Sequence, residues 1–168
     1  MNDKQLLQFK LLANDFISVW TEFCQEHTSL YDITCEEYVH LLSSDIDKLE
    51  AVVELKNNKL NTISTLDIRR KDILDSIFSI DESLKLKKVK DVVKCLKENN
   101  LLFEADQLSK LNLLLLDIIE KIQDQSKKNQ LFLNKAIISL KDLKRSFTGK
   151  TNYMTYGSNG ATRTTVTP

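Results

Sequence analysis

The sequence predicts an all-α protein: an elongated antiparallel helical bundle, or coiled-coil hairpin, of three to four helices, followed by a flexible C-terminal tail. Residues 1–148 contain no glycine or proline, whereas all three glycines and the only proline lie in residues 149–168. Because glycine permits positive φ and proline stops a helix, the long stretch without either favours helix with few tight turns. Apolar residues in that stretch repeat with heptad spacing. We therefore divide the chain into a helical bundle, residues 1–148, and a Thr/Gly/Asn-rich tail, residues 149–168.

The composition is that of a soluble single domain. The 168 residues are 42% hydrophobic and 29% charged, and 24 basic residues balance 24 acidic ones. No net charge draws the chain to nucleic acid or to an acidic membrane. Charged residues interrupt the N-terminal segment, no uncharged apolar run is long enough to span a membrane, and the three cysteines have unrelated spacings typical of reduced thiols. We expect a cytoplasmic protein without membrane insertion that has a protein partner or none.

The first helix is expected from about Asp3 to about Glu26. Its seam, with steps of three and four residues, consists of Leu6, Phe9, Ala13, Phe16, Trp20, Phe23, His27 and Leu30. We interpret the aromatic members of this seam as core, rather than as an exposed partner site. Residues 28–33 are expected to interrupt the helix.

The second helix is expected to begin at Thr34. Thr34 and Glu37 match the capping box, in which each side chain satisfies the other residue's backbone N–H at a helix start. The heptad pattern continues to about Ser79. Ser44 and Asp47 are suited to cap a restart, so the sequence also allows a kink near Ser44.

Two further helices follow. A short third helix is expected, and its apolar residues share one face: Leu86, Val89, Val93 and Leu96. Asn99 and Asn100 follow as cap residues, because Asn tolerates left-handed backbone. The last helix is expected over residues 101–147, where steps of four and three alternate without error, and it would be roughly 70 Å long. We expect the second and last helices to pair as a hairpin of matched arms, with the first helix, about half as long, leaving an apolar groove uncovered.

Polar residues also occupy seam positions. They are Lys56, Arg70, Asn112, Ser126 and Asn129. Each costs stability unless it is matched across a helix interface. We interpret them as register control in a coiled coil rather than as contacts with a partner.

The sequence offers little chemistry. Cys24, His27, Cys35 and His40 could be zinc ligands by type, but they lack the paired short-range cysteines of zinc motifs, so we predict no metal and no cofactor. No glycine-rich loop occurs before residue 149, and only two histidines are present, so we predict that the protein is not an enzyme. The lysine-rich stretch 85–97 lacks arginine and aromatics, which favours a solvated face over a nucleic-acid site.

The tail carries a short aromatic motif. Tyr153, Met154 and Tyr156 stand among small and polar residues, and Tyr156 precedes a Gly-Ser-Asn-Gly turn. An aromatic motif on a flexible tether suits docking into a partner's pocket. A spacer with incidental tyrosines is the alternative that composition leaves open.

Three stretches together carry a family pattern. The first has an acid, a leucine pair, a small-residue and Asp step and a spaced Leu, followed by a Lys and an Arg: Glu37-Tyr38-Val39-His40-Leu41-Leu42-Ser43-Ser44-Asp45-Ile46-Asp47-Lys48-Leu49, then Lys56, Leu60 and Arg70. The second is the Asn-containing stretch 129–143, and the third is the Tyr-Gly-x-x-Gly element of 155–160. In this order the features resemble the FlgN-type flagellar type III secretion export chaperones, which serve hook-filament junction proteins.

The resemblance implies a non-enzymatic, cytosolic bacterial chaperone. Such a chaperone binds the C-terminal helical segments of hook-filament junction (hook-associated) proteins, prevents their premature assembly and delivers them to the cytosolic domain of the membrane export gate. The first candidates for the partner-binding face are Leu133, Ala136, Leu140, Leu143 and Phe147.

The resemblance also assigns a role to the tail. It implies that Tyr156 docks at the gate, with Gly157 and Gly160 shaping its turn and Tyr153 as a rival. We expect a monomer or weak homodimer. The alternative is a structural coiled-coil protein whose seams pair with copies of itself.

Overall fold

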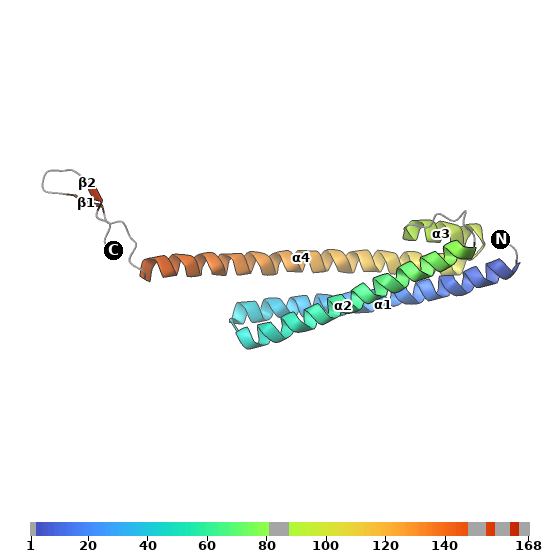
Figure 1. The fold of residues 1–168 in the computed structure, drawn as a ribbon, viewed down its shortest axis with the longest axis horizontal. Coiled ribbons are helices and arrows are strands. Elements are labelled where there is room, and N and C mark those ends of the chain that lie inside the picture. Colours follow the sequence, from blue (N-terminus) through green and yellow to red (C-terminus); the bar gives the residue numbers. More distant parts are fainter. Residues whose placement is uncertain (1–2, 81–87, 148–153, 157–161, 165–168) are drawn as a thin grey trace. The chain divides into compact units, whose positions relative to one another are not determined.

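The fold is helical, as the sequence predicts. The computed structural model describes residues 3–80, 88–147, 154–156 and 162–164 (Figure 1). Its elements are α1 (Asp3–Ser43), α2 (Ile46–Ile80), α3 (Val89–Glu98), α4 (Leu102–Phe147), β1 (Met154–Tyr156) and β2 (Thr162–Thr164). The chain forms two compact units, residues 1–129 and 130–168. The first unit is a bundle of α1, α2, α3 and the first part of α4, which confirms the all-α class.

α1 is one continuous helix of 41 residues, so the expected end near Glu26, the interruption at 28–33 and the new start at Thr34 are wrong. Thr34 is fully buried, and its hydroxyl donates to the carbonyl oxygen of Leu30 at 2.7 Å. Thr28 donates in the same way to the carbonyl of Cys24 at 2.8 Å. A threonine whose hydroxyl bonds the preceding turn needs no helix end. The Thr34–Glu37 spacing therefore lies inside a helix instead of capping one.

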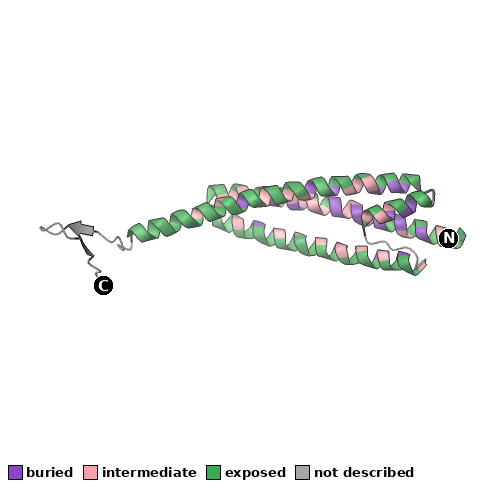
Figure 2. Ribbon diagram, turned by 90° about the horizontal axis from the view of Figure 1, so that it is seen from above, coloured by how far each residue is buried: buried purple, intermediate pink, exposed green. Residues whose placement is uncertain are grey.

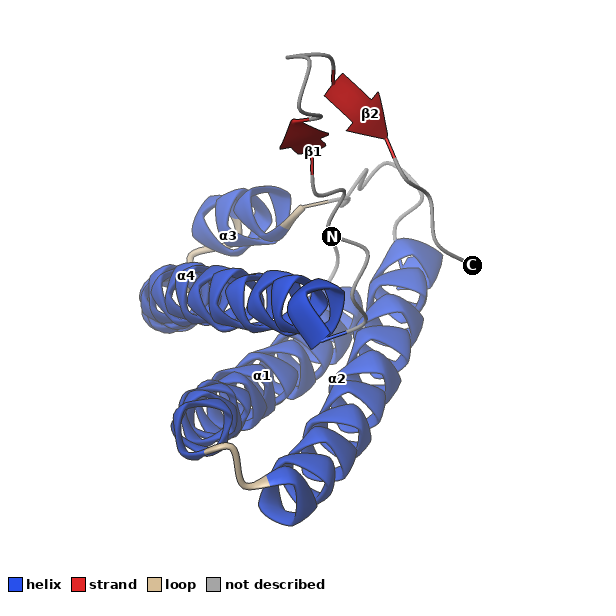
Figure 3. Ribbon diagram, turned by 90° about the vertical axis from the view of Figure 1, so that its left-hand side faces the viewer, coloured by secondary structure: helices blue, strands red, loops and turns tan. Residues whose placement is uncertain are grey.

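The chain reverses direction at Ser44, where the sequence allows a kink. Ser44 has a φ of 55°, and the carboxylate of Asp45 accepts the backbone N–H of Lys48 at 3.2 Å, which caps α2. The expected hairpin of the second and last helices is wrong. α2, with 35 residues, pairs antiparallel with α1, not with the last helix (Figures 1 and 3). The two arms match in length because α1 does not stop at Glu26.

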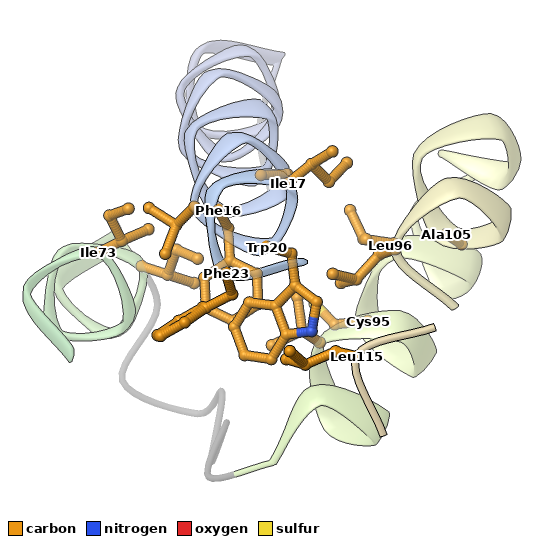
Figure 4. Packing of buried hydrophobic residues seen from close by; sticks show 14 of the residues in the cluster. Phe16, Ile17, Trp20, Phe23, Ile73, Cys95, Leu96, Ala105 and Leu115 are labelled. Atoms are coloured by element: carbon orange, nitrogen blue, oxygen red, sulfur yellow. The ribbon is translucent and has the colours of Figure 1, made fainter. Parts of the chain in front are cut away.

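The core of the first unit is built on the aromatic seam of α1. Phe9 and Phe16 are buried, Trp20 stacks on Phe16 with ring centroids 4.7 Å apart, and Phe23 meets Trp20 edge-on at 5.6 Å. The other helices add apolar side chains to this cluster, among them Ile73, Ile77, Val92, Leu96, Ala105, Leu108 and Leu115. Figure 4 shows Trp20 surrounded by side chains from other helices. The core interpretation of the aromatic seam is confirmed.

The short connection between α3 and α4 follows the predicted chemistry. Asn100 has a φ of 60°, and the N–H of Leu101 bonds the carbonyl of Leu96 at 2.9 Å. This left-handed turn ends α3 and starts α4 within one residue of the expected position. Of the predicted apolar face of α3, Leu86 lies outside the described residues.

The second unit contains the rest of α4 and a small hairpin. β1 and β2 pair antiparallel, with Thr155 opposite Arg163. The sequence predicted no strands in the tail, since its short Thr-rich segments lack the longer apolar alternation that usually marks a strand. α4 ends at Phe147, while the proposed boundary after residue 148 stays a prediction.

Candidate partner-binding surfaces

The predicted partner-binding residues of the last helix are accessible. Leu133 is 45% exposed, Leu140 64%, Leu143 53% and Phe147 81%, and Ala136 is half-buried. We call these five residues the distal stripe. Figure 2 shows that exposed residues dominate this part of α4. Exposed large apolar side chains at helical spacing are typical of a surface that binds another helix.

Sequence reasoning missed other exposed apolar residues in the same segment. Leu131, Ile137 and Ile138 are also exposed, although they lie outside the heptad positions. The heptad pattern does not include these residues, because heptad positions cover only one face of the helix. Their signal in the sequence is the high apolar content of 131–138 on several faces. Exposed apolar surface on α4 is therefore wider than the distal stripe.

The tail residues of the predicted docking motif are only partly described. Tyr156 ends β1 and pairs with Thr162. Tyr153, Gly157 and Gly160 lie outside the described residues. The choice between Tyr153 and Tyr156 therefore stays a prediction.

A polar network joins three helices of the first unit. Asn129, 5% exposed, donates from Nδ2 to the carbonyl of Thr34 at 2.9 Å and to Oε2 of Glu37 at 2.8 Å. The same Glu37 oxygen receives Lys56 Nζ at 2.6 Å, and Gln125 Nε2 donates to Oδ1 of Asn129 at 2.9 Å. We call these five residues the Asn129 network. Two of the predicted seam polar residues, Lys56 and Asn129, are thus matched across helices, as register control requires.

Arg70, another seam residue, pairs within α2. Its Nε lies 2.8 Å from Oδ1 of Asp67, and Lys71 Nζ lies 2.8 Å from the other carboxylate oxygen. The hydrogen bonds from Lys71 and then from Arg70 hold the pKa of the Asp67 carboxyl below its usual value, against an opposing effect of desolvation. Asp67 therefore stays ionised, and its charge is already matched by two cations.

A groove of about 490 Å³ lies in the first unit, and all four helices line it. We call it the central groove. It is lined by Trp20, Phe23 and His27 of α1, Ile63, Asp67 and Arg70 of α2, Lys88 and Val89 at the start of α3, and Leu115 and Ile119 of α4. The sequence predicted an uncovered apolar groove along the last helix, and the central groove includes Leu115 and Ile119 of that helix, but the sequence did not predict the α1 and α2 residues that complete it.

The residues considered for zinc have other partners. Cys24 donates to the carbonyl of Leu111 at 3.4 Å, and His27 Nδ1 lies 2.7 Å from the carbonyl of Phe23. His40 lies 3.5 Å from a carboxylate oxygen of Glu36. Within the described ranges, no group of three or more His, Cys, Asp or Glu side chains is placed to hold a metal ion.

The comparison with protein families decides what kind of protein carries these surfaces. The sequence matches the family described as FlgN protein over residues 12–164, from the third turn of α1 through β2. The chain belongs to the FlgN family. No curated protein and no solved structure matches it. The FlgN resemblance seen in the three sequence stretches is confirmed.

FlgN proteins are flagellar export chaperones, and this chain has that general role. The family is one of chaperones and is not known for enzymes. As a chaperone of export, the protein binds flagellar export substrates. Among the described helices, none combines the length and the apolar character needed to cross a membrane.

Proposed function

We propose that this FlgN protein acts in the bacterial cytoplasm on hook-filament junction proteins. It binds their C-terminal helical segments, prevents premature assembly and delivers them to the export gate. The exposure of the distal stripe on α4 is the observation that carries this proposal. An amphipathic helix presents apolar residues at i, i+3, i+4 and i+7, and the stripe repeats with the same steps.

The chaperone effect follows from covering an apolar face. A junction subunit that assembles through a helical segment must expose apolar residues on that segment before assembly. Packing that face on Leu133, Leu140 and Leu143 removes apolar surface from water on both molecules, at about 25 cal/mol per Å². The subunit is then unable to pair with another subunit through the same face.

The decisive variant is Leu140→Asp in the full chain. The probe is the C-terminal fragment of a junction protein from the same organism, and binding is measured by calorimetry. We expect binding to be lost, because a carboxylate would be buried against the incoming helix. Ile138→Asp is the matched control, since Ile138 is 58% exposed and lies off the stripe. Circular dichroism should show unchanged helicity in both variants, and retained binding by Leu140→Asp would refute the assignment.

Gate docking is assigned to the tail. Tyr156, with the turn that Gly157 and Gly160 allow, supplies the aromatic side chain for a pocket on the cytosolic domain of the export gate. Tyr156→Ala should leave fragment binding unchanged and lower binding to the isolated gate domain. Tyr153→Ala is the comparison: if it alone weakens gate binding, Tyr153 is the docking residue, and if neither does, the tail role is wrong.

Self-association is the competing function for the same exposed stripe. Light scattering on the free protein separates the two. A monomer or weak dimer that takes up the junction fragment supports the chaperone role. A stable oligomer that Leu140→Asp dissociates, and that does not bind the fragment, indicates a structural coiled-coil protein.

A further inference from the structure

We propose that the central groove is a second docking site, for an amphipathic helix of another protein with acidic residues along its polar flanks. This goes beyond the proposed function, which places substrate recognition on the distal stripe. The groove belongs entirely to the first unit, and three long helices contribute rows of side chains to it. Its shape, its apolar surface and its charge each indicate the chemistry of the occupant.

The residues that line the groove lie in rows along three helices. Trp20, Phe23 and His27 follow one another by three and four residues on α1. Ile63, Asp67 and Arg70 follow by four and three on α2, and Leu115 and Ile119 by four on α4. Side chains with these steps form rows along each helix, so the groove extends about 10 Å, or two helical turns, parallel to the bundle. Rows with steps of three and four residues are the arrangement into which the side chains of a further helix pack in coiled coils.

The apolar surface of the groove is incompletely covered. Ile63 and Ile119 pack against the core but are only half-buried. Both therefore keep apolar area in contact with water that a docked helix would remove. The rings of Trp20 and Phe23, which are buried and meet edge-on within α1, give the groove a rigid floor. A rigid apolar floor reduces the entropy lost on binding.

The charged residues that line the groove determine which charge the partner helix should carry beside its apolar face. Asp67 is neutralised by Arg70 and Lys71, each at 2.8 Å, so it does not repel an incoming carboxylate strongly. Arg70 and Lys88 both line the groove, and Lys88 is exposed. Because Arg70 pairs with Asp67, the charge left in excess on the lining is that of Lys88, which favours acidic residues beside the apolar face of the partner.

The test uses a synthetic helix as probe. A labelled, tryptophan-free peptide of roughly 18 residues, about five turns, carries Leu and Ile at heptad positions and Glu on both flanks. Fluorescence anisotropy with the full chain measures its affinity. Ile119→Glu and Ile63→Glu should each lower the affinity at least tenfold. Leu116→Glu and Ile68→Glu change exposed residues on the same two helices and should leave it unchanged. Thermal melting checks that all four variants fold.

Trp20 gives an independent signal because it is the only tryptophan of the chain and lines the groove. Its emission should shift as the peptide saturates the wild-type protein. An unchanged emission at saturation would overturn the proposal. Peptide binding that is lost in Leu140→Asp but kept in Ile119→Glu and Ile63→Glu would also overturn it, while leaving the distal stripe as the docking site.

A charge exchange tests the acidic flank. Lys88→Glu should weaken binding of the Glu-flanked peptide several-fold and improve binding of an otherwise identical Lys-flanked peptide. Lys94→Glu, on the helix that begins directly after Lys88 but outside the groove lining, is the control and should change neither. If the wild type binds the two peptides with equal affinity, the claim that the partner helix carries acidic flanks is wrong. A wild-type dimer that Ile119→Glu dissociates would show that a second copy occupies the groove instead.

Discussion

Asn129 has a small side chain, but removing that side chain should lower the free energy of unfolding substantially, because its hydrogen bonds join two helices. Asn129→Ala deletes one hydrogen bond to the Thr34 carbonyl and one to the Glu37 carboxylate, both on another helix. It also deletes the bond that Gln125 donates to Oδ1, which adds little because the half-buried Gln125 can bond water instead. A neutral hydrogen bond contributes about 1 kcal/mol and one to a charged group about 2 kcal/mol. The better helix propensity of alanine offsets about 0.5 kcal/mol. Lys56 still pairs with Glu37, so no unpaired carboxylate is left. The free energy of unfolding should therefore fall by about 2.5 kcal/mol.

Urea unfolding followed by circular dichroism measures this change, and thermal melting should show a fall in Tm of roughly 5–10 °C. Asn134→Ala is the matched control. Asn134 is an exposed residue of α4, so the same substitution there should be neutral or slightly stabilising. Equal effects of the two substitutions would show that the Asn129 network does not hold α4 to α1. A double-mutant cycle with Glu37→Gln should give a coupling energy of about 1 kcal/mol, since the two side chains are in direct contact.

Three further substitutions test other parts of the bundle. Phe16→Ala should lower the free energy of unfolding by about 3–5 kcal/mol, because it empties a buried site beside Trp20, whereas Phe103→Ala at a 76% exposed site should change it by less than about 0.5 kcal/mol. Ser44→Gly should raise stability by about 1 kcal/mol in urea unfolding, because glycine adopts the φ of 55° without strain, and Ser43→Gly inside α1 should not. Asp67 has a lowered pKa in the folded state, so its ion pairs contribute stability above the unfolded-state pKa of about 3.9, and this is lost as the pH falls through the folded-state pKa. The stability advantage of the wild type over Asp67→Asn in urea unfolding should thus shrink below about pH 4, and an advantage that stays constant with pH would contradict the ion pairing.

The parts of the fold that sequence predicted well depend on local repeats. α4 begins and ends within a residue of the expected bounds because its alternation of three and four steps is unbroken and Asn100 marks its start. The aromatic seam of α1 predicted the core for the same reason. Periodicity reports which residues share a face, and a face made of several Phe and Trp residues favours burial.

The errors came from local signals that tertiary structure overrode. Thr34 and Glu37 have the spacing of a capping box, but Thr34 bonds the preceding turn and Glu37 turns toward Lys56 and Asn129. These partners lie 19 and 92 residues away in sequence, so no short-range pattern reveals them. A first helix that ends at residue 26 is too short to match the second helix, so the predicted lengths favour pairing the second helix with the last one. The true length of α1, 41 residues, makes α1 the partner of α2 instead.

The candidate sites illustrate the same limit. The heptad stripe of α4 continues through Leu108, Leu115, Leu133 and Leu140 without any change of pattern, yet the first two residues are buried and the last two are exposed. The repeat fixes which residues share a face, but not what covers that face. The central groove is likewise made of rows from three helices that only folding brings together. A helical chaperone needs both properties: seams strong enough to build its own core, and more seam than that core buries, since the surplus is what a foreign helix can occupy.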